Sequence, residues 1–154
     1  MIVETEIEIS APPIRVWRAL CDFEAYSKWN PYREIRGEAG PNEKVKIFVG
    51  SDPARRYGMR AVICHFEPGK RISFRTGNPL FSRATETFSL EPIRKGTLLR
   101  HSAEMTGVSV LVLGRGRIGS RLINVYRRVD SALAKYVTLT SQPDRRAERH
   151  RRGK

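Results

Sequence analysis

The sequence predicts a single α+β domain in which a curved antiparallel sheet of about seven strands wraps around one long C-terminal helix. Three observations support this fold class. Residues 1–10 alternate apolar and polar side chains as a strand does, six further strand-like segments follow between residues 33 and 106, and the apolar spacing becomes helical from residue 118 onward. A chain of 154 residues also suits one domain better than two.

The first strand should bury one of its sides and expose the other. Val3, Thr5, Ile7 and Ile9 share one side, and three glutamates share the opposite side. We therefore expect a half-buried strand with an acidic outer side.

Two short helices are expected after this strand. Prolines suit a first helical turn, so the first helix should begin near residues 11–13. It continues through apolar residues at helical spacing, namely Ile14, Trp17, Leu20 and Cys21. Asp22 can cap a second helix over Phe23–Lys28. Pro31 limits this helix, because the residue before a proline avoids the α region.

The six later strands are short and separated by turn residues, which is typical of an antiparallel meander. The expected strands are residues 33–38, 44–49, 58–66, 71–76, 83–90 and 97–106. A strongly curved sheet that closes on a helix should leave space between the two.

The long C-terminal helix is expected over residues 116–140, and the glycines before it predict a bent entry. Residues 141–154 are polar and basic, so we expect a tail that is disordered unless bound. The folded domain should span residues 1–140. Five apolar side chains of the helix should face the sheet: Ile118, Leu122, Val125, Val129 and Leu133.

The chain is strongly basic, with 29 Lys and Arg against 16 Asp and Glu and a formal net charge of +13. Such a surface can attract nucleic acid, anionic membranes or anionic ligands. The arginines do not gather in a known nucleic-acid-binding motif. We therefore expect a solvated basic surface, with nucleic-acid or anionic-membrane binding as an alternative.

The pattern of the first residues and the cysteines favours a cytoplasmic protein. Residues 1–10 lack the basic and apolar regions of a signal peptide. Cys21 and Cys64 lie far apart in the sequence, and neither has metal-ligand spacing. We expect both to be reduced, and we expect no metal or cofactor. The glycine pattern at 114–119 lacks the βαβ context that a phosphate-binding loop requires.

Four motifs in order resemble the START and pollen-allergen superfamily with the helix-grip fold, and within it the polyketide cyclase/dehydrase-like group. They are SAPP at 10–13 with the following VW, the segment 22–31, FEPGKRISF at 66–74, and the segment 88–107. The resemblance covers about residues 1–140. It implies an internal cavity for a small molecule. It does not select one function, because the superfamily includes lipid carriers, hormone receptors and cyclases.

Glu86 and His101 are the main candidates for chemistry. Glu86 shares its side of the strand with Phe88 and Leu90, so it should point inward, where burial would raise its pKa. His101 is on the inward side of the next strand, and the turn at 94–96 should bring the two into contact. The pair could act as acid and base or anchor a ligand. Alternatively, Glu86 could simply form a salt bridge with an arginine and His101 could be a structural residue.

Large apolar side chains are candidates for the wall of the cavity. Leu80 and Phe81 fall in a loop, where they could form a lid over the mouth. The expected ligand-binding residues, besides Glu86 and His101, are Trp29, Tyr32, Phe48, Phe74, Leu80, Phe81, Phe88, Met105, Ile118 and Leu122.

The leading hypothesis for function is therefore the binding or carriage of a small apolar, aromatic or lipid-like molecule by a monomer or homodimer. The first alternative is a cyclase- or dehydratase-like enzyme that uses Glu86 and His101. The second is nucleic-acid or anionic-membrane binding through the basic surface and the tail at 141–154.

Overall fold

The computed structural model describes residues 1–112 and 115–140 and confirms the α+β helix-grip fold. The predicted tail at 141–154 lies outside the described residues. The elements, in chain order, are β1 (Ile2–Ile9), α1 (Pro13–Cys21), α2 (Tyr26–Trp29), β2 (Arg33–Arg36), β3 (Lys44–Val49), a 3-10 turn (Pro53–Arg55), β4 (Tyr57–Glu67), β5 (Arg71–Asn78), β6 (Ser82–Ile93), β7 (Gly96–Thr106), α3 (Val108–Val112) and α4 (Arg115–Leu139).

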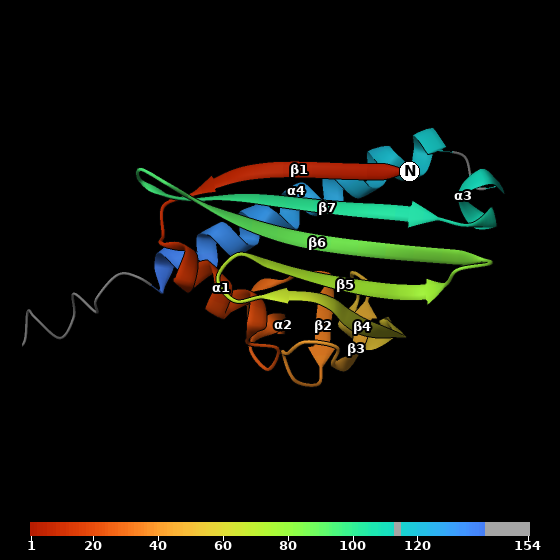
Figure 1. The fold of residues 1–154 in the computed structure, drawn as a ribbon, viewed down its shortest axis with the longest axis horizontal. Coiled ribbons are helices and arrows are strands. Elements are labelled where there is room, and N and C mark those ends of the chain that lie inside the picture. Colours follow the sequence, from red (N-terminus) through yellow and green to blue (C-terminus); the bar gives the residue numbers. More distant parts are fainter. Residues whose placement is uncertain (113–114, 141–154) are drawn as a thin grey trace, which may run out of the picture.

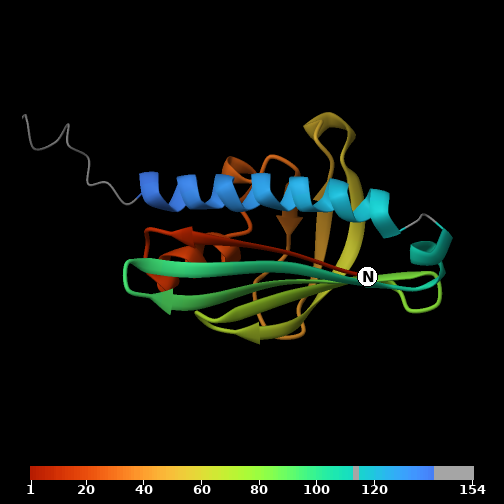
Figure 2. The same ribbon diagram turned by 90° about the horizontal axis from the view of Figure 1, so that it is seen from above.

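The seven strands form one antiparallel sheet in the order β1-β7-β6-β5-β4-β3-β2. Strands β2 to β7 form the predicted meander, and β1 pairs with the last strand, with Ile2 opposite Glu104 and Ile9 opposite Thr97. The sheet curls so that α4 lies along its concave face, as the two views show (Figures 1 and 2). None of the described helices is long and apolar enough to cross a membrane.

The pairing of β6 with β7 determines which side chains point toward α4. Leu90 lies opposite Leu99, Phe88 opposite His101, and Glu86 opposite Ala103. All six are buried, because successive residues of a strand alternate between its two faces and these share the inner face. The predicted inward direction of Glu86 and His101 is confirmed.

The long helix α4 covers the concave face with one buried stripe. Val129 and Leu133 are buried, as predicted, together with Val137 and Tyr126, while Leu122 and Val125 are half-buried. Their spacing of three or four residues places them on one side of the helix. The side chain of Ile118 lies outside those that the structure describes.

The helices after β1 differ from the prediction in two details. The second helix is a single turn that begins at Tyr26 rather than Phe23, although Asp22 does accept a hydrogen bond from the Ala25 N–H (3.2 Å). Ile14 is 52% exposed, and Val16 is buried instead. α1 packs on the sheet through Val16, Trp17 and Leu20, so the side chain of Ile14 in the first turn points to solvent.

The hairpin between β5 and β6 is longer than predicted, with a shorter loop. Gly77 pairs with Arg83 and Asn78 pairs with Ser82, so only residues 79–81 remain at the tip. Gly77 has a φ of 81°, and a Cβ there would lie 2.0 Å from the Ser82 carbonyl oxygen. Glycine is the residue that permits this close approach.

Candidate functional site

A cavity of about 430 Å³ lies between the concave face of the sheet and α4. Its volume is within the range typical of small-molecule sites. Its polar or partly polar lining residues come from four strands and α4: Arg33, Tyr57, Thr76, Ser82, Glu86 and Tyr126. The remaining wall is mostly apolar and includes Ile47, Val49, Met59, Phe74, Ala84, Ala103, Met105 and Leu122.

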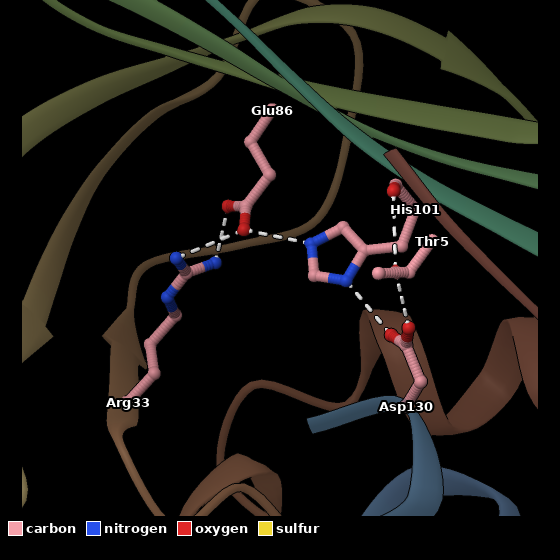
Figure 3. A network of polar contacts seen from close by, with 5 residues as sticks. All are labelled: Thr5, Arg33, Glu86, His101 and Asp130. Atoms are coloured by element: carbon pink, nitrogen blue, oxygen red, sulfur yellow. Dashed lines mark hydrogen bonds and ion pairs between the residues drawn. The ribbon is translucent and has the colours of Figure 1, made fainter. Parts of the chain in front are cut away.

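On one side of the cavity, polar side chains form a network of contacts that extends from β2 to α4 (Figure 3). Arg33 on β2 contacts Glu86 on β6, Glu86 contacts His101 on β7, and His101 contacts Asp130 on α4. Thr5 on β1 completes it by donating a hydrogen bond to Asp130 Oδ2 (2.5 Å). The network therefore joins β1, the short β2 strand, the β6–β7 hairpin and α4.

The contact between Arg33 and Glu86 is bidentate. Arg33 Nη2 donates to Glu86 Oε1 at 3.0 Å, and Nη1 donates to Oε2. The two side chains are only 17% and 10% exposed. A paired fork of this kind fixes direction as well as distance. It therefore holds the Glu86 carboxylate in one orientation at the cavity wall.

His101 lies behind Glu86 and is fully buried. Its Nε2 is 2.9 Å from Glu86 Oε1, and its Nδ1 is 2.8 Å from Asp130 Oδ1. The ring is also stacked between Phe88 and Tyr126, with centroid distances of 4.1 and 3.8 Å. Ionised carboxylates only accept hydrogen bonds. Both ring nitrogens can therefore donate at once only when His101 is an imidazolium.

The electrostatics of the network follow from this arrangement. Burial by itself lowers the pKa of His101, but the hydrogen bonds to Asp130 and Glu86 outweigh it and raise that pKa above its ordinary value. Burial by itself raises the pKa of Glu86, but Arg33 and His101 outweigh it and hold that pKa at about 2. The two cations and two carboxylates sum to no net charge, which is how a buried set of ions is tolerated.

The expected rise of the Glu86 pKa is therefore wrong. That prediction considered burial alone, whereas the structure shows the alternative, a salt bridge between Glu86 and an arginine, with Arg33 as the partner. Glu86 is an ionised carboxylate whose two oxygens are already engaged, by Arg33 and by His101. Tyr126, which also lines the cavity, remains a neutral phenol, because burial and the nearby Glu86 charge raise its pKa.

Four of the predicted ligand-binding residues line the cavity: Phe74, Glu86, Met105 and Leu122. His101 and Phe88 lie in the layer behind it, stacked on each other. Trp29 is in the core against Tyr26, with ring centroids 4.5 Å apart. Tyr32 packs at the edge of the core, where its hydroxyl accepts a hydrogen bond from Arg128 (3.0 Å).

Phe48, Leu80 and Phe81 do not line the cavity, and the side chain of Ile118 lies outside those that the structure describes. Phe48 is on the outer face of β3, because it alternates with the inward Ile47, and Arg36 lies 4.5 Å above its ring. Leu80 and Phe81 are at the hairpin tip, 73% and 72% exposed, and the cavity lining stops at Gly77 and Ser82. The lid expected from these two residues is absent from the lining, because pairing of β5 with β6 carries the tip beyond the cavity.

Sequence reasoning missed Arg33, Tyr126, Asp130 and Thr5 as parts of the site. Signals for two of them were present. Arg33 shares its side of β2 with the buried Ile35, and Asp130 falls within the apolar stripe of α4, one residue after Val129. A charged residue at a position that should be buried needs a partner. The partners themselves lie on other elements and could not be named from spacing.

The described residues contain no group of three or more His, Cys, Asp or Glu side chains that could hold a metal ion. The two carboxylates of the network are separated by the imidazole ring between them. What the arrangement offers to a molecule in the cavity is therefore an apolar surface with one polar wall. That wall presents the guanidinium of Arg33, the carboxylate of Glu86 and the side chain of Tyr126.

Comparison with known proteins agrees with the fold. A family model described as polyketide cyclase/dehydrase and lipid transport matches residues 1–138. The chain is similar to a START superfamily protein from Mycobacterium smegmatis, with a TM-score of 0.74 and 19% identity over 91% of this chain and 99% of that one. It is also similar to TTHA0849 from Thermus thermophilus, with a TM-score of 0.73 and 17% identity over 92% and 100% of the two chains.

A third similar structure is DynU16, a protein of the dynemicin biosynthetic locus, with a TM-score of 0.71 and 17% identity. The match covers 89% of this chain and 47% of DynU16. No curated protein matches the chain significantly. At these identities the structural similarities establish the fold alone.

Proposed function

The chain belongs to the polyketide cyclase/dehydrase and lipid transport family, and we propose that it binds and carries a small, largely apolar molecule in the cavity between the sheet and α4. The observation that carries this proposal is a cavity of about 430 Å³ with a mostly apolar wall and one ordered polar side. Apolar surface supplies affinity in such sites, while a few fixed polar groups orient the ligand.

The polar side favours a ligand with an oxygen acceptor at one end. Arg33 uses two of its five N–H groups on Glu86, and the side chain also lines the cavity. A ligand carbonyl, hydroxyl or ether oxygen could accept a hydrogen bond from a further N–H. A neutral ligand suits the site, because Arg33 is already balanced by the Glu86 charge.

The protonation of the network argues against acid–base catalysis by Glu86 and His101. A catalytic acid or base works best when its pKa is near the working pH, and the pKa of Glu86 is about 2. His101 is fully buried behind Glu86 and is enclosed by two aromatic rings. These features support a role for His101 in positioning Glu86 and Arg33 rather than in proton transfer to a ligand.

Binding of N-phenyl-1-naphthylamine, a neutral apolar fluorescent probe, tests the proposal. Leu122→Trp adds bulk to the cavity wall, and Leu139→Trp makes the same change at an exposed position of the same helix. We expect the parent and Leu139→Trp to bind the probe alike, and Leu122→Trp to bind at least about tenfold more weakly while its circular dichroism is unchanged. Equal binding by both variants, or no binding by the parent, would contradict the proposal.

Native mass spectrometry of protein purified from its own host gives a second, independent reading. A carrier should retain a molecule of defined mass, and solvent extraction should release it chemically unchanged. Conversion of the extracted molecule by the parent protein, together with its loss in Glu86→Gln, would favour the enzyme alternative instead.

A further inference from the structure

One end of the molecule exposes large apolar side chains on two adjacent segments. Leu80 and Phe81 at the β5–β6 tip are 73% and 72% exposed, and Val108 and Val112 of α3 are 56% and 77% exposed. Among the described residues, eight large apolar side chains are exposed, and these are four of them. Both views place the hairpin tip and α3 at the same end (Figures 1 and 2). We call these four residues the apolar end.

The two segments are held together, so the apolar end is a single surface. The Ser109 N–H donates to the Phe81 carbonyl oxygen at 3.0 Å. Gly107 has a φ of 108°, and a Cβ there would lie 2.7 Å from the same Phe81 oxygen. Only glycine permits this approach at the point where the chain leaves β7 for α3. The exposure of the four side chains is therefore a property of an ordered surface.

The apolar end adjoins the proposed ligand cavity. A groove of about 410 Å³ beside it is lined by Leu80, Val108, Val110, Met1 and Met105, among others. Met105 also lines the ligand cavity, and so does Ser82, next to Phe81 in the chain. The apolar end therefore borders a groove that shares Met105 with the ligand cavity.

Positive charge predominates in the chain around the apolar end, where the nearest carboxylate in the sequence is that of the exposed Glu104 near the end of β7. Neither residues 68–85 nor residues 105–129 contain an Asp or a Glu. The first stretch includes Arg75 and Arg83, and the second includes five arginines, among them the exposed Arg121 of α4. Large apolar side chains in segments that are rich in arginine complement a surface that is apolar inside and anionic outside.

We propose that the apolar end docks on an anionic lipid bilayer, with Leu80, Phe81 and Val112 entering the boundary between headgroups and acyl chains. The nearby arginines would then lie at the level of the lipid phosphates, where each adds to the attraction toward the anionic surface. A second copy of the chain is a poorer occupant, because a symmetric contact would press two cationic ends together. Docking goes beyond the proposed carriage and does not require a bound ligand.

Sedimentation of the full chain with vesicles tests the docking. The vesicles are phosphatidylcholine alone or phosphatidylcholine with about one-third phosphatidylserine. The test variant is Leu80→Ser with Phe81→Ser. The control is Ile14→Ser with Leu139→Ser, which removes two apolar side chains that are 52% and 58% exposed on other elements. All four positions are exposed, so both proteins should fold, and circular dichroism checks this.

We expect the parent and the control to bind the anionic vesicles and to bind the neutral ones much more weakly. The test variant should partition at least about tenfold less onto anionic vesicles, since burying even part of two large apolar side chains is worth more than that factor. Equal binding by the test variant and the control would overturn the proposal, because binding would then follow net charge alone. Absence of binding to anionic vesicles would overturn it as well.

Two further measurements separate this proposal from its alternatives. Analytical ultracentrifugation that shows a parent dimer, and a monomer for the test variant, would assign the apolar end to a second copy and overturn docking on lipid. Binding of N-phenyl-1-naphthylamine by the test variant without vesicles should equal that of the parent. The cavity and the docking surface can therefore fail independently of each other.

Discussion

Replacing Glu86 by glutamine should destabilise the protein at neutral pH and remove part of its acid sensitivity. Glu86→Gln preserves the shape of the side chain but removes the negative charge between Arg33 and His101. Two buried cations would then face a neutral amide. Leaving a buried charge without its partner is costly, typically about 3–5 kcal/mol.

The pKa of Glu86 gives a second measure of the magnitude. It falls from an ordinary 4.5 to about 2, and at about 1.4 kcal/mol per pH unit this difference is worth about 3 kcal/mol of unfolding free energy. The folded pKa is the lower one, so this stability is fully present above pH 4.5. This stability is lost as the pH falls from 4.5 toward 2, because in this range Glu86 binds a proton in the unfolded state but not in the folded state.

Urea unfolding followed by circular dichroism between about pH 2 and pH 7 measures both effects. At pH 7 we expect Glu86→Gln to be about 3 kcal/mol less stable than the parent, and the difference should shrink toward pH 2. Glu91→Gln is the matched control, because Glu91 lies on the same strand with its side chain 59% exposed. The reasoning is refuted if Glu86→Gln matches the control in stability at pH 7 and in its dependence on pH.

Two other predictions concern the same core. Nitrogen-15 NMR of His101 at pH 7 should show both ring nitrogens protonated, since Glu86 and Asp130 both accept from the ring; a neutral single tautomer would contradict the ionised network. Because the pKa of His101 is raised above 6.5, its contribution to stability should be complete below that pH and lost as the pH rises through the folded value. Leu133→Ala should lower the unfolding free energy by about 2–5 kcal/mol, because Leu133 is fully buried beneath the sheet; a loss below about 1 kcal/mol in urea unfolding would show that α4 does not carry the core.

The network also bears on how the cavity keeps its shape. Arg33 comes from a four-residue strand at one edge of the sheet, and Asp130 comes from the helix on the opposite layer. Both are bonded to the β6–β7 hairpin, Arg33 through Glu86 and Asp130 through His101 (Figure 3). A ligand that contacts Arg33 therefore meets a side chain whose position is set by the whole domain, which favours a preformed site.

Much of the fold was predictable because it depends on the spacing of apolar residues within each strand and helix. Alternation with a period of two placed Val3, Ile9, Phe74 and Phe88 on the inner face, and the change to helical spacing placed Val129 and Leu133 under the sheet. The contact between Glu86 and His101 was predictable for the same reason. The two residues lie on strands joined by a tight turn, so counting outward from the turn brings them together.

The functional residues that escaped prediction are those whose partners are distant in the chain. Arg33 and Glu86 are 53 residues apart, and Thr5 and Asp130 are 125 residues apart. Residues such as Leu80 and Phe81 were misplaced for a related reason. Their apolar character was visible, but whether the hairpin tip folds over the cavity or projects beyond it depends on how far β5 and β6 continue to pair.

The sequence by itself determined the order of the elements, the inner face of each strand and the buried stripe of the long helix, because these depend on backbone periodicity and on burial of apolar side chains. Only the tertiary structure decided the charge state of the site. A buried carboxylate alone would be protonated, whereas Glu86 between Arg33 and His101 is ionised with a pKa of about 2. Curling of the sheet around α4 brings those charges within hydrogen-bonding distance, and no local pattern encodes that closure.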